Sequence, residues 1–356
     1  MTFFARRDGW RGDRDSSREK FIATIAVLCG ACLLVGLASI ALGAAAIAPA
    51  RIVRILQGEF AQSADSMILL NIRLPRTLLG FLIGGALALS GALLQALFRN
   101  PLADPGVVGI SAGAALAAAA AIVLGDRFAA PLMSAYSVWA LPVAAFLGGL
   151  VATSLLYVLS TRLGRTSIAT MLLAGIGVGS FAGSLTGLLA TISDDRQLRD
   201  LTFWLLGSLG GANWSKTAVA AALIMPVFLA APFLARSLNA LALGEAEAFH
   251  LGVHVERDKR IMIALASMAV GVGVALAGPI GFIGIVAPHL IRLTVGADHR
   301  LVLPASILLG GSLLVLADIL ARTVAAPAET PIGILTGLIG APFFLWLLST
   351  RMRYFE

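Results

Sequence analysis

The chain has 356 residues, of which 59% are hydrophobic and only 13% are charged. So few charged residues cannot cover the surface of a soluble globule, so a water-soluble protein is excluded. The net charge of +7 comes from short arginine clusters beside apolar runs, not from one basic face. This distribution reflects membrane topology and excludes nucleic acid as a partner. We therefore predict an all-α, polytopic membrane protein.

The N-terminal residues 1–20 contain six basic and four acidic side chains and show no apolar periodicity. They predict a flexible cytoplasmic tail ahead of a single transmembrane domain over residues 21–356. The first apolar run, 21–43, is longer than the roughly 7–15-residue core of a cleavable signal peptide, which favours a retained span. Cys29 and Cys32 lie inside this run with no His or carboxylate nearby, so we interpret them as packing residues.

A membrane-spanning helix needs about 20 apolar residues, and fewer where protein instead of lipid surrounds it. This measure predicts about ten spans with both termini cytoplasmic. They cover residues 21–43, 74–97, 107–124, 138–159, 168–192, 217–235, 261–277, 280–294, 302–321 and 332–349. Glycine and other small residues dominate several of them, for example GGALALSGALLQ at 84–95. Small residues let helices approach closely, which predicts a tightly packed bundle.

This topology places arginines in every predicted cytoplasmic connection, as the positive-inside rule expects. Arg73, Arg76 and Arg322 lie on the opposite side. Positive charge at these three positions therefore needs another explanation.

The most organised connection is the charged run 236–260, between the sixth and seventh spans. Ala246, Phe249 and Val253 recur at helical spacing, and the acidic Glu245 and Glu247 suit a helix N-terminus. Gly252 offers a stop after them. We predict a short surface helix, although a solvated amphipathic loop has the same pattern.

Two motifs of metal-dependent enzyme chemistry are missing: the sequence has no H-E-x-x-H and no Cys/His metal spacing. Residues 210–217, GGANWSKT, resemble a phosphate-binding loop, but Ser215 replaces its second glycine and no strand precedes it. We predict that the chain is not an enzyme, holds no cofactor and needs a separate chain for any ATP hydrolysis. Asp318 could serve an ion-coupled carrier, but Arg322 stands one helical turn away and can pair with it.

Several ordered segments carry a family resemblance. They are RLPRTLLGFLIGGALALSGALLQALFRNPLADPGVVGISAG at 73–113, LALGEAEAFHLGV at 241–253, AGPIGFIGIVAPHLIRL at 277–293, LADILAR at 316–322 and PAETPIGILTGLIGAPFFLWLL at 327–348. With them the chain resembles, over about residues 20–352, the FecCD-type permeases of type II ABC importers, which carry ferric siderophores, haem and cobalamin.

The resemblance implies a homodimer in the bacterial inner membrane, with a pathway along its two-fold axis. Two ATPase subunits, which hold ATP and Mg²⁺, would bind on the cytoplasmic side, and a periplasmic haem- or chelate-binding protein would bind on the other. The cytoplasmic segment at about 237–258 would couple to the ATPase. Its matching residues are Leu243, Gly244, Glu245, Ala246, Glu247, Phe249, Leu251, Gly252 and Val253.

Two further sets of residues match the family. Arg165, Thr166, Ser167 and Thr170, between the fourth and fifth spans, correspond to the cytoplasmic gate. Arg73, Arg76 and Arg322 correspond to arginines that pair with glutamates of the binding protein, which would explain their charge on the outer side. A pair between Arg322 and Asp318 is the competing interpretation.

The substrate is suggested by two segments, GRTSIATMLLAG at 164–175 and SDDRQLRDLTFWLLGSLGGANW at 193–214, which are most similar to haem permeases. We predict haem, with ferric siderophores and cobalamin as the alternatives. No axial haem ligand is evident along the spans expected to line the pathway, and a translocation path must in any case bind weakly enough to release its cargo.

Overall fold

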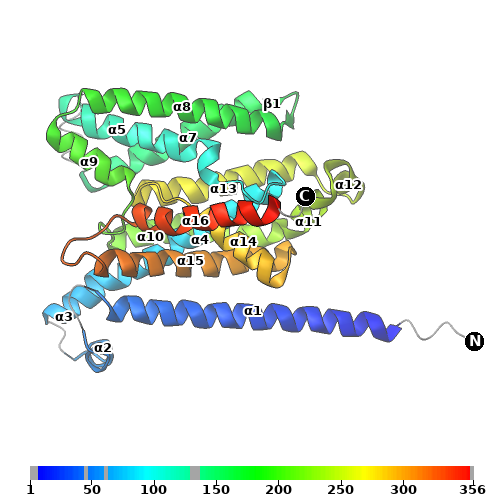
Figure 1. The fold of residues 1–356 in the computed structure, drawn as a ribbon, viewed down its shortest axis with the longest axis horizontal. Helices are drawn as coiled ribbons and strands as arrows, with labels where there is room; N and C mark the ends of the chain where they lie inside the picture. Colours follow the sequence, from blue (N-terminus) through cyan, green and yellow to red (C-terminus); the bar gives the residue numbers. More distant parts are fainter. Residues whose placement is uncertain (1–6, 44–46, 60–62, 129–136, 353–356) are drawn as a thin grey trace, which may run out of the picture.

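The computed structural model describes residues 7–43, 47–59, 63–128 and 137–352. Over these ranges the chain is a bundle of long helices that run side by side (Figure 1). The first half holds α1 (Arg7–Ala41), α2 (Pro49–Leu56), α3 (Ala64–Met67), the π-helical turn η1 (Ile68–Arg73), α4 (Leu74–Leu97), η2 (Pro105–Val108), α5 (Ile110–Phe128) and α7 (Ser137–Ser160).

The second half begins with β1 (Thr161–Arg162), β2 (Arg165–Thr166), α8 (Ile168–Thr191), α9 (Asp195–Leu205), α10 (Trp214–Ala230) and η3 (Ala231–Leu234). It continues with α11 (Ala235–Leu243), α12 (Glu245–His250), α13 (Val255–Ala277), α14 (Ile283–Val295), α15 (His299–Thr323) and α16 (Ile332–Met352).

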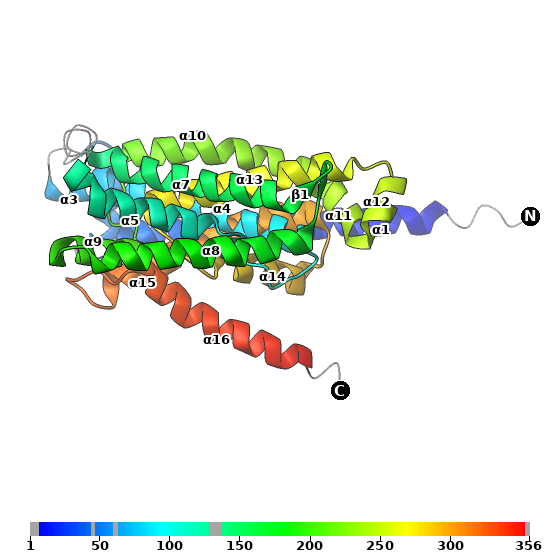
Figure 2. The same ribbon diagram turned by 90° about the horizontal axis from the view of Figure 1, so that it is seen from above.

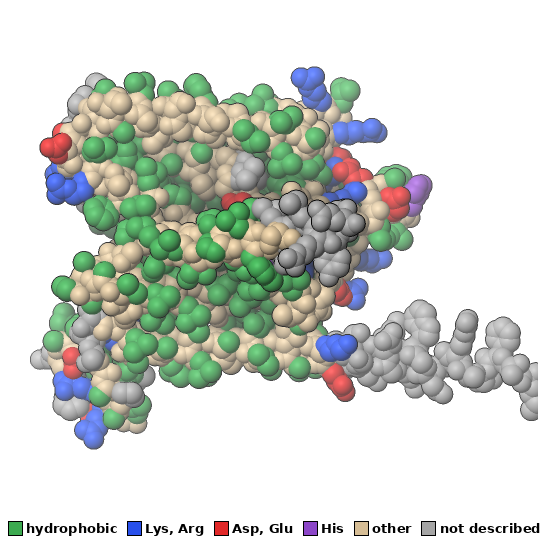
Figure 3. Space-filling model, viewed as in Figure 1, with side chains coloured by type: hydrophobic (Ala, Val, Ile, Leu, Met, Phe, Trp, Pro, Cys, Tyr) green, Lys and Arg blue, Asp and Glu red, His purple; other side chains and the backbone are tan. Residues whose placement is uncertain are grey.

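The ten predicted spans are all found. Seven described helical segments are long and apolar enough to cross a membrane, and three shorter apolar helices, Ile110–Gly125, Ile283–Val295 and Ile332–Trp346, match the remaining predictions. On the face shown in Figure 3, side chains of Lys, Arg, Asp and Glu gather at the two ends of the bundle, and hydrophobic side chains are spread over the surface between them. The all-α, multi-pass prediction is therefore confirmed.

The core of the bundle is α4, which packs against α10, α13, α14 and α15. In its best apolar window 83% of the residues are buried, whereas the corresponding window of α1 has 0% buried. α1 runs along one flank against α15, and α8 runs along the opposite flank against α5 and α7 (Figure 1). α16 diverges from the bundle toward its C-terminus (Figure 2).

The two ends of the bundle differ. One end, here called the α12 end, carries the β1–β2 hairpin, α11 and α12 (Figure 1). The other, the α9 end, carries α2, α3, α9 and the connection 324–331. The first described turn of α1 and the last of α16 both point toward the α12 end, which agrees with an even number of spans.

One boundary differs from the sequence prediction. Residues 1–20 are expected to form a flexible tail, but α1 begins at Arg7, and residues 1–6 lie outside the described ranges. The charged residues 7–20 continue the apolar helix directly, with neither proline nor a glycine pair at the junction, so nothing in the sequence ends the helix there.

Glycines set the spacing between helices. A Cβ on Gly84 would collide with the backbone of Gly310 in α15, and one on Gly91 would overlap the carbonyl oxygen of Gly284 in α14. Gly113 and Gly148 bring α5 and α7 together in the same way. The prediction of close packing through small residues is confirmed.

We expect Gly91→Ala to destabilise the permease by about 1–3 kcal/mol, because the added methyl must push α4 and α14 apart. Gly30→Ala in α1 is the matched control, since nothing lies within 4 Å of a Cβ there. The measurement is thermal unfolding of both variants in the same detergent. Equal melting temperatures would contradict the close contact between α4 and α14.

Candidate functional site

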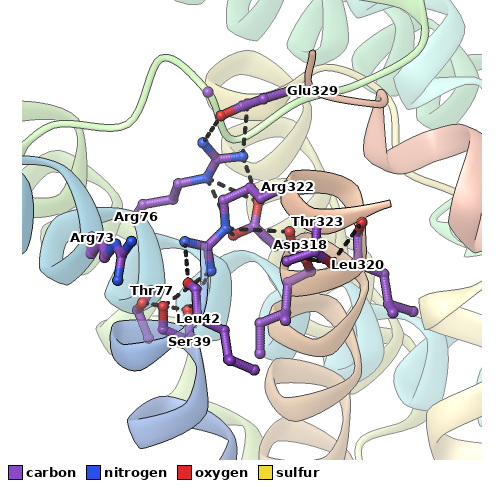
Figure 4. Close-up of polar contacts among 12 residues, drawn as sticks. Ser39, Leu42, Arg73, Arg76, Thr77, Asp318, Leu320, Arg322, Thr323 and Glu329 are labelled. Atoms are coloured by element: carbon purple, nitrogen blue, oxygen red, sulfur yellow. Dashed lines mark hydrogen bonds and ion pairs between the residues drawn. The ribbon is translucent and has the colours of Figure 1, made fainter. Parts of the chain in front are cut away.

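Three arginines predicted from the sequence as a docking set meet at the α9 end. Arg73 closes η1, Arg76 lies in the first turn of α4, and Arg322 lies in the last turn of α15. Their side chains converge on Asp318 and on the end of α1 (Figure 4). The three are therefore brought together, although 242 residues separate Arg76 from Asp318.

Arg76 binds two carboxylates at once. Its guanidinium contacts Asp318 Oδ1 at 2.8 Å from Nη2, and it donates to both oxygens of Glu329 at 2.8 and 3.0 Å. The side chain of Arg76 is 5% exposed and that of Asp318 is 1% exposed, whereas that of Glu329 is 46% exposed. Arg76 thus joins a buried carboxylate to one that faces the outside.

Arg322 holds the other side of the same carboxylate. Its Nε contacts Asp318 Oδ2 at 3.0 Å, and its Nη2 donates to the carbonyl and the hydroxyl of Ser39 at 3.2 and 3.0 Å. The Ser39 hydroxyl lies 2.7 Å from that of Thr77 in α4. The predicted Asp318–Arg322 pair is confirmed, and it forms part of a larger network.

Arg73 caps α1. Its Nη1 donates to the carbonyl oxygens of Ile40 at 2.6 Å and Ala41 at 3.0 Å, in the last turn of α1. The last carbonyls of a helix have no partner within the helix and carry negative partial charge, so a guanidinium satisfies both needs. The residue is 3% exposed.

The sequence pattern suggests that the three arginines are free charges on the outer surface. The structure shows that they are not. Each is buried and bonded inside the protein, because Asp318, Glu329 and the end of α1 supply acceptors. A small cavity of about 180 Å³ nevertheless reaches them, lined by Gly43, Ile68, Ile72, Arg73, Arg76, Arg322, Pro327 and Glu329.

Glu329 is the residue of this cluster to which sequence reasoning gives no role. It lies in the connection between α15 and α16, within the PAET segment that contributes to the family resemblance. The hydrogen bond from Arg76 holds the pKa of Glu329 below its usual value. Glu329 is therefore a carboxylate at neutral pH and stays paired with Arg76.

The predicted gate residues lie at the opposite end, in and after the β1–β2 hairpin. Thr161 pairs with Thr166 and Arg162 with Arg165. The turn residues Leu163 and Gly164 have φ of +50° and +77°, typical of the two-residue turns that fit the strand twist. Arg165 is exposed and Thr166 is buried.

The remaining gate residues begin α8. Ser167 is its N-cap and accepts a hydrogen bond from the Thr170 amide at 3.3 Å and from the Thr170 hydroxyl at 2.9 Å. Both residues are exposed. The hairpin therefore leads directly into α8.

The short helix predicted in the 236–260 run is present as α12, and Gly252 follows it with φ of +80°. Ala248 is fully buried and anchors this helix. Ala246 and Phe249, expected on one apolar face with Val253, are exposed instead. The side chain that packs inward is offset from the predicted stripe because so short a helix has room for one buried position.

The other residues of this segment form a projecting surface. Leu243, Phe249 and Leu251 are exposed by 68%, 68% and 57%. Gly244, which adopts φ of +144°, separates α11 from α12 and lets the chain turn sharply. Glu245 and Glu247 lie in the first turn of α12. Large apolar side chains beside acids at an exposed tip are typical of a protein interface.

Comparison with known proteins gives a consistent result. The model of the FecCD transport family matches residues 31–350. The chain is 47% identical to the hemin transport system permease of Yersinia pestis, over 89% of this chain and 93% of that one. It is 46% identical to the cobalamin import permease of Halobacterium salinarum, over 79% and 73%, and 42% identical to a vitamin B12 import permease of Escherichia coli, over 84% and 89%.

Among solved structures, an inward-facing metal-chelate type ABC transporter superposes with a TM-score of 0.78 at 31% identity. The match covers 92% of this chain and 99% of the other. The fold, the ten apolar helices and the sequence matches agree. The chain belongs to the FecCD transport family and is a permease subunit of a type II ABC importer.

Proposed function

We propose that this permease imports haem across the bacterial inner membrane, as a homodimer that works with two ATPase subunits and a periplasmic binding protein. The chain itself is neither an enzyme nor a cofactor carrier, and ATP and Mg²⁺ belong to the ATPase. The observation that carries the choice of haem is the 47% identity to a hemin permease over 89% of this chain. Cobalamin remains the second candidate because the cobalamin permease is 46% identical over 79%.

An ion-coupled carrier is the alternative from another class. Such a carrier needs an intramembrane acid that can gain and lose its ion. Asp318 is bound by two guanidinium groups, which occupy both of its carboxylate oxygens. Among the described residues no group of three or more His, Cys, Asp or Glu gathers as a metal site. These observations favour a permease driven by a separate ATPase.

The α9 end suits an acidic partner. The cavity that reaches Arg73, Arg76 and Arg322 would admit a carboxylate of a docking protein, and charge complementarity would orient it. Glu329 already occupies Arg76 from the outer side. Docking at Arg76 therefore requires an exchange of carboxylates, in which the partner's glutamate displaces Glu329.

The α12 end suits the ATPase. The exposed side chains of Leu243, Phe249 and Leu251 provide apolar anchors, and the fully buried Ala248 fixes the helix that carries them. A rigid projecting helix can transmit a push, whereas a flexible loop would absorb it. Arg165, Thr166, Ser167 and Thr170 would form the gate beside the two-fold axis.

Reconstitution in liposomes tests the function. We expect haem uptake only with the cognate ATPase, the haem-loaded binding protein and ATP, while cobalamin and ferric siderophores compete weakly. Titration of the same three ligands against the binding protein checks the selectivity. Uptake driven by an ion gradient in this chain alone would contradict the ABC mechanism, and preference for cobalamin would contradict the substrate.

Glu329→Gln tests the exchange at Arg76. Loss of the charge weakens the resident pair, so we expect the binding protein to bind about 3–10-fold more tightly, equivalent to about 0.7–1.4 kcal/mol. Glu59→Gln, which removes an exposed carboxylate at the same end, is the control. Weaker binding by Glu329→Gln would show that Glu329 assists the partner instead of competing with it. The measurement is a binding isotherm at fixed ionic strength.

Phe249→Ala tests the ATPase contact. Truncating a large exposed anchor at an interface costs more than about 1 kcal/mol when it fills a pocket of the partner, so we expect the ATPase to bind about tenfold more weakly. Leu293→Ala, at an exposed position in α14 near the same end, should leave the affinity unchanged. Equal effects of the two substitutions would place the ATPase elsewhere.

A further inference from the structure

A buried lysine lies between α12 and the β1–β2 hairpin. Lys259, in the second turn of α13, is 2% exposed and is among the largest fully buried side chains of the protein. Burying an ammonium group is unfavourable unless acceptors surround it. One acceptor for Lys259 comes from α12, one from the β1–β2 hairpin and one from α13 itself.

The three N–H donors of the ammonium group all have partners. Nζ donates to Glu245 Oε2 at 2.7 Å, to Glu256 Oε1 at 3.2 Å and to the carbonyl oxygen of Thr166 at 3.4 Å. A lysine ammonium has three donors, so this geometry satisfies it fully. Glu245 begins α12 and Thr166 lies in β2. One side chain therefore connects the helix proposed to meet the ATPase with the strand proposed to form the gate.

Thr166 is held on both sides of its backbone. Its amide donates to Glu256 Oε2 at 3.0 Å, while its carbonyl accepts from Lys259. The next residue of α13, Arg260, donates to the carbonyl of Gly164 in the hairpin turn at 3.2 Å. The first turns of α13 are thus hydrogen-bonded to the hairpin at Thr166 and at Gly164.

The link from Lys259 to α12 is an ion pair with Glu245. The carboxylate of Glu245 is 44% exposed, so it lies where the projecting surface meets the interior. A buried ammonium that lost one of its carboxylates would be left partly uncompensated, which is costly. A displacement of α12 is therefore more easily met by movement of Lys259 and the hairpin than by rupture of the pair.

We propose that Lys259 is a positioning residue that transmits a displacement of α12 to the β1–β2 hairpin and through it to α8. This inference rests on the proposed function, because it takes α12 as the ATPase contact and the hairpin as part of the gate. Lys259 touches neither substrate nor nucleotide. Its role is to make the two surfaces move as one.

The test uses the complete transporter, with the permease, the ATPase and the loaded binding protein in liposomes. We expect Lys259→Met to keep ATP hydrolysis within about twofold of wild type while uptake falls at least tenfold, so that the uptake per ATP falls. Arg300→Gln removes one exposed positive charge at the same end and should leave this ratio unchanged. Parallel loss of uptake and hydrolysis, or retention of both, would overturn the proposal.

Hairpin movement gives a readout that a merely structural role would not change. A spin label on Leu163→Cys, a position at the tip of the hairpin with a fully exposed side chain, reports the distance between the two copies after Cys29→Ser and Cys32→Ser. We expect ATP to change this distance in the otherwise wild-type permease and not in Lys259→Met. A change in both would overturn the relay alone. A change in neither would overturn the assignment of the hairpin to the gate, and the relay with it, while haem uptake by the wild-type transporter tests the proposed function separately.

Milder variants cover the case in which Lys259→Met does not fold. Glu245→Gln weakens the link to α12 and Glu256→Gln weakens the link to the hairpin, while both retain the buried lysine. Because the two links act in series, the double variant should lower the uptake per ATP no more than the stronger single variant. Independent, additive losses would show that the two carboxylates have separate structural roles, which would overturn the relay.

Discussion

The carboxylate of Asp318, buried between the guanidinium groups of Arg76 and Arg322, organises the α9 end of the permease. A buried charge is tolerated only when it is paired and hydrogen-bonded, and a pair that loses one member is strongly destabilised. Asp318 has both partners, and each arginine brings a further contact. Arg76 binds the connection before α16 through Glu329, and Arg322 binds the end of α1 through Ser39. Four segments distant in sequence therefore depend on one acid.

This arrangement changes the meaning of positive charge on the outer side. Arginines against the positive-inside bias suggest docking, but here most of their donors are already used inside the protein. The two functions are compatible because the network is open at the exposed carboxylate of Glu329. An acidic partner would replace one carboxylate by another and leave Asp318 covered. The strength of the Arg76–Glu329 pair thus sets how strongly the carboxylate of a docking protein must bind Arg76 to displace Glu329.

Local patterns in the sequence were sufficient for the fold and for part of the site. The ten apolar helices, the close approach at glycines, the Asp318–Arg322 pair and the short helix α12 all follow from spacing of a few residues along the chain. The contact of Arg76 with Asp318 joins residues 242 positions apart, and no periodicity encodes it. The burial of Ala248 and of Lys259 was missed for the same reason, since both depend on how neighbouring elements pack. Its charge alone predicts that a lysine side chain is exposed, but acceptors from other elements allow Lys259 to be buried.

The two polar clusters lie at opposite ends of a bundle whose centre is apolar. Between Arg76 and Arg99 the chain has no charged residue, and α4 packs along α13, with the Ser90 hydroxyl donating to the carbonyl of Ala266 at 3.2 Å. Close-packed interiors shift between discrete arrangements and do not deform continuously. Lys259 lies in the second turn of α13, at the α12 end, and Arg76 lies in the first turn of α4, at the α9 end. The two helices pack against each other between these residues. We therefore expect α4 and α13 to shift as rigid bodies during transport, and we expect the ion pairs at their ends to determine which neighbouring elements shift with them.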